Sequence, residues 1–139
     1  MNTAVPPRIL HVPAIQHSAL GEHSEVNVSE VVFFFFPASL TPEDIAGIMA
    51  SVDKLRPTLE RSESLGLFDG WAEEVDIENP NPDLGGEKSR VWVNVVGWKD
   101  VAAHMRMQQS EDFAANIHHL TGITSIRGSE LYHAKLIKL

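Results

Sequence analysis

An unbroken apolar run, Val31–Phe36, constrains the fold of this chain more than any other stretch, because it holds four consecutive phenylalanines and stops at Pro37. Short runs of β-branched and aromatic residues that end at proline are typical of β-strands. Successive strand side chains point to opposite faces, so Val31, Phe33 and Phe35 share one face, and Val32, Phe34 and Phe36 share the other. Burying one phenylalanine is worth roughly 1.5–3 kcal/mol. We therefore expect cover on both faces, from helices on one and a second copy of the chain on the other.

Composition narrows the class of protein further. The 139 residues are enough for one domain with a proper core. A net charge of −8 without a run of basic residues argues against nucleic-acid or anionic-membrane partners. The absence of cysteine excludes disulfides, thiolate catalysis and cysteine-based metal sites, and it fits a cytoplasmic protein. No apolar run approaches the ~20 residues of a spanning helix, and the first 13 residues lack the apolar block of a secretory signal.

Residues 1–26 are expected to form an N-terminal arm ahead of a domain that covers residues 27–139. Three prolines interrupt the arm, and its histidines recur every six residues, at His11, His17 and His23. That spacing matches neither one helical face nor a tight chelating turn, so metal binding by the arm is disfavoured. A segment such as residues 8–12 is instead a candidate for a short added strand or for a contact with a partner.

The remainder predicts the order β-α-β-β-α-β, which is the ferredoxin-like split βαβ arrangement. Strands are expected at residues 27–36, 65–76, 90–97 and 131–139, with 123–126 also in the sheet. Residues 77–89 contain Asn-Pro-Asn-Pro and Gly-Gly and are expected to be a long loop that is mobile or lid-like. The fold class is thus α+β, and the uncovered face of its sheet is expected to pair with a twin chain.

Two helices are expected between these strands. The first starts at Thr41-Pro42, is ended or kinked by Pro57, and buries an apolar stripe at helical spacing: Ile45, Ile48, Met49, Val52, Leu55 and Leu59. The second is capped by Asp100, continues after a second cap at Ser110, and ends at Gly122. Its predicted buried stripe is Val101, Met105, Phe113, Ile117 and Leu120.

The stretch from Val96 to His104, Val-Gly-Trp-Lys-Asp-Val-Ala-Ala-His, followed by Ser110-Glu-Asp-Phe113, resembles a known superfamily. It is similar to small fungal members of the dimeric α+β barrel superfamily, which includes antibiotic-biosynthesis monooxygenases, stress-responsive barrel proteins and polyketide cyclases. The resemblance covers residues 27–139 and leaves the arm unexplained. It implies a homodimer whose sheets pack into a barrel, and a pocket between sheet and helices that takes hydrophobic aromatic or polyketide-like compounds, often without a cofactor.

Three side chains are candidates for acid–base chemistry. His104 lies in the second helix, where it is a general base facing the pocket, a histidine packed on Trp98, or a solvated side chain. His133 lies in the last strand, in phase with Leu131, on a face expected to be buried, either as a hydrogen-bonded core residue or as a catalyst. Asp69 shares a strand face with apolar neighbours, where it either orients a histidine or acts as a base, unless Asp69-Gly70 forms a turn.

Aromatic and polar side chains are candidates for the wall of the pocket. A core role would explain most of the aromatic ones equally well. The residues proposed to contact substrate are Phe34, Phe36, Phe68, Trp71, Trp92, Asn94 and Tyr132.

Three functions remain open at this point. The first is a cofactor-free cyclase, isomerase or dehydratase that acts on an enolisable polyketide-like substrate through His104, His133 and Asp69, with Asn94 and Tyr132 stabilising an oxyanion. The second is a cofactor-free monooxygenase of an anthrone-like carbanion. The third is a non-catalytic dimeric binding or stress-response protein. No metal is expected in any of them.

Overall fold

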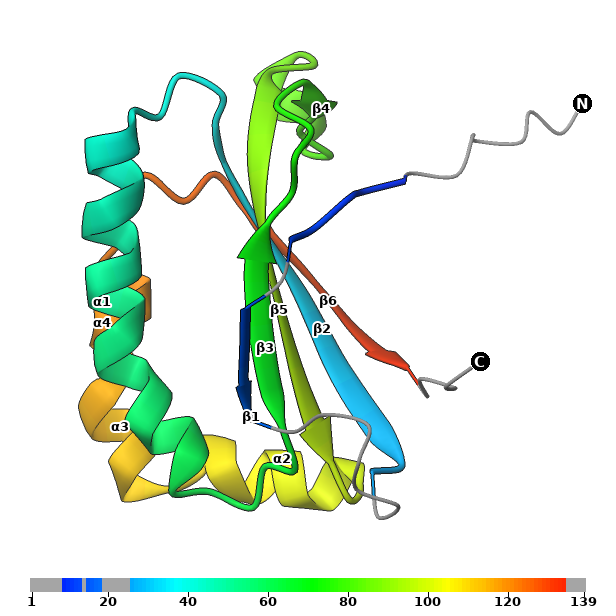
Figure 1. Cartoon of the computed structure of the whole chain (residues 1–139), viewed down its shortest axis with the longest axis vertical. Helices are drawn as coiled ribbons and strands as arrows, with labels where there is room; N and C mark the ends of the chain where they lie inside the picture. Colours follow the sequence, from blue (N-terminus) through cyan, green and yellow to red (C-terminus); the bar gives the residue numbers. More distant parts are fainter. Residues whose placement is uncertain (1–8, 14, 19–25, 135–139) are drawn as a thin grey trace, which may run out of the picture.

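A single antiparallel sheet with all its helices on one side organises the computed structural model, which describes residues 9–13, 15–18 and 26–134 (Figure 1). The strand order is β1-β3-β5-β2-β6, with β4 paired to β5. Within it, β2, α1, β3, β5, the helices α2 to α4 and β6 follow the predicted β-α-β-β-α-β order. The fold is therefore α+β and ferredoxin-like, as the sequence predicts.

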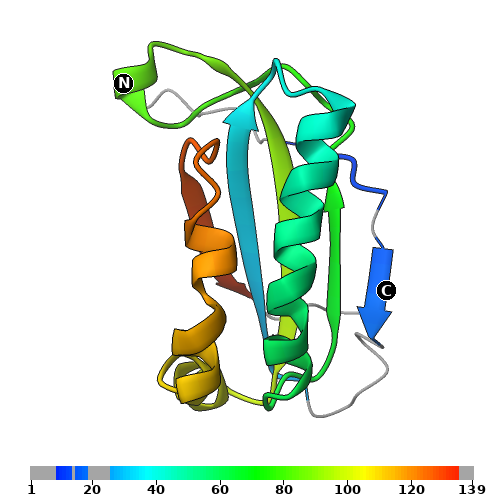
Figure 2. The same cartoon turned by 90° about the vertical axis from the view of Figure 1, so that its left-hand side faces the viewer.

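The elements have the following bounds. The strands are β1 Ile15–Ser18, β2 Val28–Pro37, β3 Leu67–Trp71, β4 Ile77–Glu78, β5 Lys88–Trp98 and β6 Ser129–Ala134. The helices are α1 Pro42–Glu60, α2 Val101–Gln108, α3 Glu111–Asn116 and α4 His118–Thr121, with a 3-10 turn, η1, at Pro82–Leu84. Figure 2 shows α1 lying along the sheet, with α3 and α4 beside it.

Strand β2 confirms the alternation predicted for the phenylalanine run. It lies between β5 and β6, so both of its edges are paired. Phe35 and Phe36 are both fully buried, but in different clusters on opposite faces of the sheet. We call the face that bears Phe36 and the helices the inner face, and the other the outer face.

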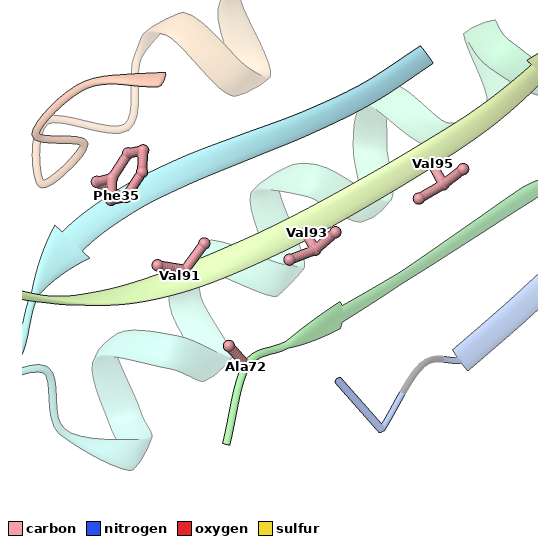
Figure 3. Close-up of a cluster of buried hydrophobic side chains, with 5 residues drawn as sticks. All are labelled: Phe35, Ala72, Val91, Val93 and Val95. Carbon is pink, nitrogen blue, oxygen red and sulfur yellow. The ribbon is translucent and has the colours of Figure 1, made fainter. Parts of the chain in front are cut away.

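The outer face carries a cluster of small β-branched side chains around Phe35, drawn in Figure 3: Phe35, Ala72, Val91, Val93 and Val95. Leu10 and Val12, from the start of the described chain, pack against this cluster. His11 between them is bound to Glu74 through its backbone N–H, 3.0 Å from Oε2, and through its ring. The chain itself therefore covers part of the face that the sequence assigns to a second copy.

Helix α1 covers the inner face as its apolar spacing predicts. Thr41 and Asp44 form a reciprocal capping box at its start, which satisfies two backbone N–H groups. Ile48, Val52 and Leu55 are buried. Of the two outcomes predicted for Pro57, the end of the helix is wrong, because α1 continues to Glu60, and a kink stays a prediction.

The predicted stripe of the second helical segment is wrong in α2 only. Asp100 and Ser110 cap α2 and α3, and Gly122 ends α4, as predicted. Val101 and Met105 are each 45% exposed, because α2 instead turns Ala103 and Met107 toward the fully buried Trp98. The rest of the stripe does face the helix-covered side of the sheet, where it lines a cavity: Phe113, Ile117 and Leu120.

Several boundaries also differ from the prediction. Residues 123–126 are not a strand, and the predicted strand at 65–76 is limited to β3. The predicted loop 77–89 contains β4 and η1, and the buried Asn79 ties it to the backbone oxygen of Arg127 at 3.0 Å. In the arm, the added strand is β1, which pairs with β3, and not residues 9–12.

None of the helices that the structure describes combines the length and apolar character needed to cross a bilayer.

Candidate functional site

A cavity of about 230 Å³ lies between the inner face of the sheet and the helices. Its walls are mainly apolar, from β2, β5, α1 and the α2–α4 segment, with a small set of polar side chains among them. Apolar walls with a few polar groups are typical of sites for small molecules. The polar side chains that line it are Glu30, Arg56, Asn94, His104, Gln108 and Ser129.

His104 lies at one end of this cavity and is only 2% exposed. The Asp100 carboxylate accepts a hydrogen bond from the Ala103 backbone N–H at 2.8 Å and so fixes the start of the helix that carries His104. The imidazole stacks on Trp98 with ring centroids 5.2 Å apart. His104 therefore packs on Trp98 and also faces the cavity, so the solvated alternative is wrong, and its role as a general base stays a prediction.

Glu30 is the residue of this site that the sequence analysis did not single out. It lies on β2 opposite Val96 on one side and His133 on the other, and its side chain is 12% exposed. Its Oε2 contacts Nε2 of His104, but the pair does not reach hydrogen-bond geometry, so neither atom has a hydrogen-bond partner among the described residues. A carboxylate thus lies buried against an imidazole at the wall of an apolar cavity.

His133 completes the group from β6. Its Nε2 lies 3.1 Å from Nδ1 of His104, so the His104 ring stands between Glu30 and His133. The predicted phase is confirmed, because His133 and Leu131 are opposite inner-face residues of β2. The prediction that this face is buried at β6 is wrong: His133 is exposed, and Leu131 is 48% exposed.

Burial favours the neutral forms of Glu30 and His104. It raises the pKa of Glu30 to about 7, and the Trp98 indole N–H, which approaches the carboxylate, offsets this only in part. Burial also lowers the pKa of His104, and the positive charge that His133 can carry lowers it further. Desolvation is the largest cause of both shifts, so the neutral imidazole of His104 lies beside a carboxyl group that changes its charge near pH 7.

This arrangement is suited to moving a proton. A carboxyl with a pKa near 7 and a neutral imidazole are matched to acid–base chemistry at physiological pH. His133 connects the buried pair to solvent, because it is exposed and within hydrogen-bond distance of His104. The same three residues are also possible metal ligands, since one ligand atom from each lies within 4.8 Å of the others.

Asp69 lies in a different environment. It is inside β3, not in a turn, and is 3% exposed. Its Oδ2 is ion-paired with Arg56 of α1 and accepts a hydrogen bond from Trp92 Nε1 at 3.0 Å. It borders a second hollow of about 420 Å³ and is not among the residues that line the cavity at His104. The structure therefore pairs Asp69 with an arginine rather than bringing it to the histidines.

The predicted pocket wall is divided between the two faces. Phe34, Trp92 and Asn94 line the cavity. Phe36 and Trp71 belong to the inner face but pack beside it, in the cluster against α1. Phe68 and Tyr132 are on the outer face, where Phe68 joins the Phe35 cluster and Tyr132 packs edge-on against Phe33. The structure does not bring these two outer residues to the cavity, so Tyr132 is not placed to stabilise an oxyanion there.

The two other predicted features lie away from the cavity. None of residues 77–89 lines it, so the predicted lid does not border this site. In the arm, His11 is paired with Glu74, His23 lies outside the described residues, and the side chain of His17 is not described.

Comparison with known proteins supports the fold. No family model matches the sequence, and no curated protein matches it. A candidate monooxygenase from Lactobacillus acidophilus NCFM matches 89% of this chain at 16% identity and a TM-score of 0.53, and the chain spans 49% of that protein. A dimeric ferredoxin-like protein of unknown function from Thermobifida fusca YX matches 86% of this chain and 99% of its own at 12% identity and a TM-score of 0.53. At these identities the similarity concerns the fold alone.

Proposed function

We propose that this protein is a cofactor-independent enzyme that transfers a proton on a small hydrophobic, enolisable substrate. The observation that carries the proposal is the buried Glu30–His104 pair at the wall of an apolar cavity, with His133 leading from it to solvent. General acid–base assistance of this kind contributes roughly 10²–10⁴-fold to a rate.

The residues take distinct roles in this reaction. Ionised Glu30 or neutral His104 removes a proton from a carbon next to the substrate carbonyl. Asn94 and Gln108, which line the same cavity, donate hydrogen bonds to the enolate oxygen. His133 returns the proton to solvent or takes one from it. Asp69 acts indirectly, because it holds Arg56 at the wall of the cavity.

The cavity favours a flat and apolar substrate. Phe34 and Trp92 stack at 5.1 Å and form an aromatic surface of the cavity, next to Val32. A polyketide-derived ring, as the family resemblance suggests, fits this chemistry, and the outcome would be cyclisation, isomerisation or dehydration. We also propose that the protein works as a homodimer that associates through the outer face, for which light scattering is the direct test.

Proton exchange on a model ketone tests the reaction class. The probe is 2-tetralone in deuterium oxide, with deuterium entry next to the carbonyl followed by NMR. We expect catalysed exchange by the wild type and a loss of about 100-fold or more in His104→Gln and in Glu30→Gln.

The control for these variants is His118→Ala, which removes a histidine on α4 that does not line the cavity. It should exchange the ketone like the wild type. Circular dichroism of every variant separates lost chemistry from lost structure. Equal exchange by the wild type and a folded His104→Gln variant would exclude the mechanism.

A monooxygenase reaction on an anthrone-like carbanion is the second candidate. It is favoured by Trp92 and Asn94, which share the inner face of β5 and both line the cavity. Oxygen consumption with anthrone as substrate separates it from the first candidate, which uses none. A protein that binds 2-tetralone but neither exchanges its protons nor consumes oxygen with anthrone would instead be a binding protein.

A further inference from the structure

We propose that Glu30, His104 and His133 form a binding site for one divalent transition-metal ion of the zinc class. The proposal concerns the same residues as the proposed function but does not depend on it. Nitrogen and carboxylate donors together favour zinc, cobalt and related ions over magnesium or calcium.

The ligand set has the composition of an open metal site. Two imidazoles and one carboxylate are three protein ligands, the number that catalytic zinc sites use with the fourth position left for water or substrate. One donor atom from each residue lies within 4.8 Å of the other two. Donors around tetrahedral zinc are about 3.3 Å apart, given bond lengths of about 2.0–2.1 Å. Nδ1 of His104 and Nε2 of His133 are 3.1 Å apart, which is already close to this spacing.

The buried atoms of this group are unsatisfied without a cation. Glu30 Oε2 and His104 Nε2 face each other, and neither has a hydrogen-bond partner among the described residues. Buried polar atoms normally have partners, so such a pair requires an explanation. A dication held by Glu30 and the imidazoles would give the carboxylate the positive partner that its burial demands.

Trp98 positions two of the proposed ligands, as residues next to the ligands do in known metal sites. The indole of Trp98 stacks on the His104 ring at 23° and fixes its plane, and the indole N–H approaches the Glu30 carboxylate. Because Glu30 and His104 also line the cavity, the remaining coordination position would face the cavity.

Calorimetry with Zn²⁺ and visible absorption with Co²⁺, on the full chain after treatment with a chelator, test the proposal. We expect one ion in this site, with the intense visible bands of four-coordinate Co²⁺. Glu30→Gln and His133→Ala should each weaken binding by at least about tenfold and abolish those bands. Neither variant needs to disturb the fold, because Gln is nearly isosteric with Glu and His133 is exposed.

The matched control is His118→Ala. The adjacent rings of His118 and His119 on α4 are a second pair of imidazoles to which added metal could bind. It should leave the Co²⁺ bands unchanged. The proposal is overturned if Zn²⁺ binds more weakly than about 1 mM at pH 8, or if binding survives both Glu30→Gln and His133→Ala.

Exchange of 2-tetralone in the same samples keeps the two proposals distinguishable. Inhibition of metal-free exchange by Zn²⁺ supports both. Binding of Zn²⁺ to a protein that exchanges nothing supports the metal site and contradicts the proposed reaction. Exchange that needs added metal supports the site and contradicts the cofactor-free mechanism. Exchange that is indifferent to Zn²⁺, with no Co²⁺ bands, overturns the metal site alone.

Discussion

Glu30 and Asp69 are both carboxylates on the inner face of one sheet, yet their surroundings differ in one decisive respect. Asp69 has a permanent cation, because the Arg56 guanidinium pairs with it and Trp92 donates a second hydrogen bond. Glu30 has only His104 in ion-pair contact among the described residues, and that imidazole tends to be neutral. Arginine keeps its charge at any physiological pH, whereas histidine does not.

The difference separates a structural carboxylate from a reactive one. A buried ion pair with arginine is fixed, since breaking it leaves an uncompensated charge. A buried carboxyl beside a neutral imidazole changes its charge near pH 7 and can exchange a proton or accept a cation. The sequence analysis assigned chemistry to Asp69, whose charge is fixed by its ion pair. It did not single out Glu30, whose charge changes near pH 7.

The largest expected effect comes from removing the permanent cation. Arg56→Met should lower the free energy of unfolding by about 3–5 kcal/mol, because the buried Asp69 loses its charged partner. Urea denaturation measures this. Asp69→Asn in the same chain should restore much of the loss, since no buried charge then remains. If Arg56→Met lowers the free energy of unfolding by no more than the loss of an exposed ion pair does, the contrast between the two carboxylates is wrong.

Arg106→Met is the control for that measurement. Arg106 pairs with Glu63 on the surface, with both side chains more than half exposed. An exposed ion pair contributes about 0–1 kcal/mol.

Glu30→Gln should change how stability depends on pH, with a smaller effect. A carboxyl whose pKa is raised from 4.5 to about 7 by burial binds its proton more tightly in the folded state. Its stabilising contribution is complete below about pH 4.5 and is lost as the pH rises to about 7. The variant lacks this loss, so its stability relative to the wild type should increase by about 3 kcal/mol between pH 4.5 and pH 8.

Thermal or urea unfolding at several pH values tests this prediction, and Glu63→Gln supplies a control of opposite sign. The exposed Glu63 has its pKa lowered by its hydrogen bond to Arg106, so its contribution is lost as the pH falls. The contribution of His104 is common to the wild type and Glu30→Gln and largely cancels. Parallel stability curves for these two proteins would show that Glu30 is not buried as a neutral group.

The smallest expected effect is on the titration of His104. Burial is the main cause of its lowered pKa, and the charge on His133 is the second. His133→Ala should therefore raise the pKa of His104 part of the way back, with little change in stability because His133 is exposed. NMR titration of the imidazole protons measures this. His118→Ala should leave that pKa where it is, and a lower pKa in His133→Ala would contradict the placement of His133.

The strands could be predicted because the side chains of a strand alternate between its two faces with a two-residue period. This period is the same whatever the strand packs against. The same period could have identified Glu30, since it is in phase with Val32 and Phe34 inside the predicted strand. An acidic residue on an otherwise apolar strand face was the signal that drew attention to Asp69. The sequence contains this signal at both Glu30 and Asp69, but only Asp69 was predicted from it.

The partners of these residues were not predictable from local pattern. The rotation of α2 depends on the fit of Ala103 against Trp98, and an eight-residue helix has too few turns for its periodicity to show this. The pairing of Asp69 with Arg56 joins β3 to α1 across the inner face, and the meeting of His104 with His133 joins α2 to β6. Such long-range contacts appear only once the strand order is known.

The packing of Leu10 and Val12 on the Phe35 cluster bears on how two chains can associate. A partner sheet that docks on this face meets that segment first, and it must either rest on top of it or displace it and break the contact between His11 and Glu74. If two chains associate through this face as proposed, assembly is coupled to the position of Leu10 and Val12, and a change at these two residues should alter the oligomeric state without touching the cavity.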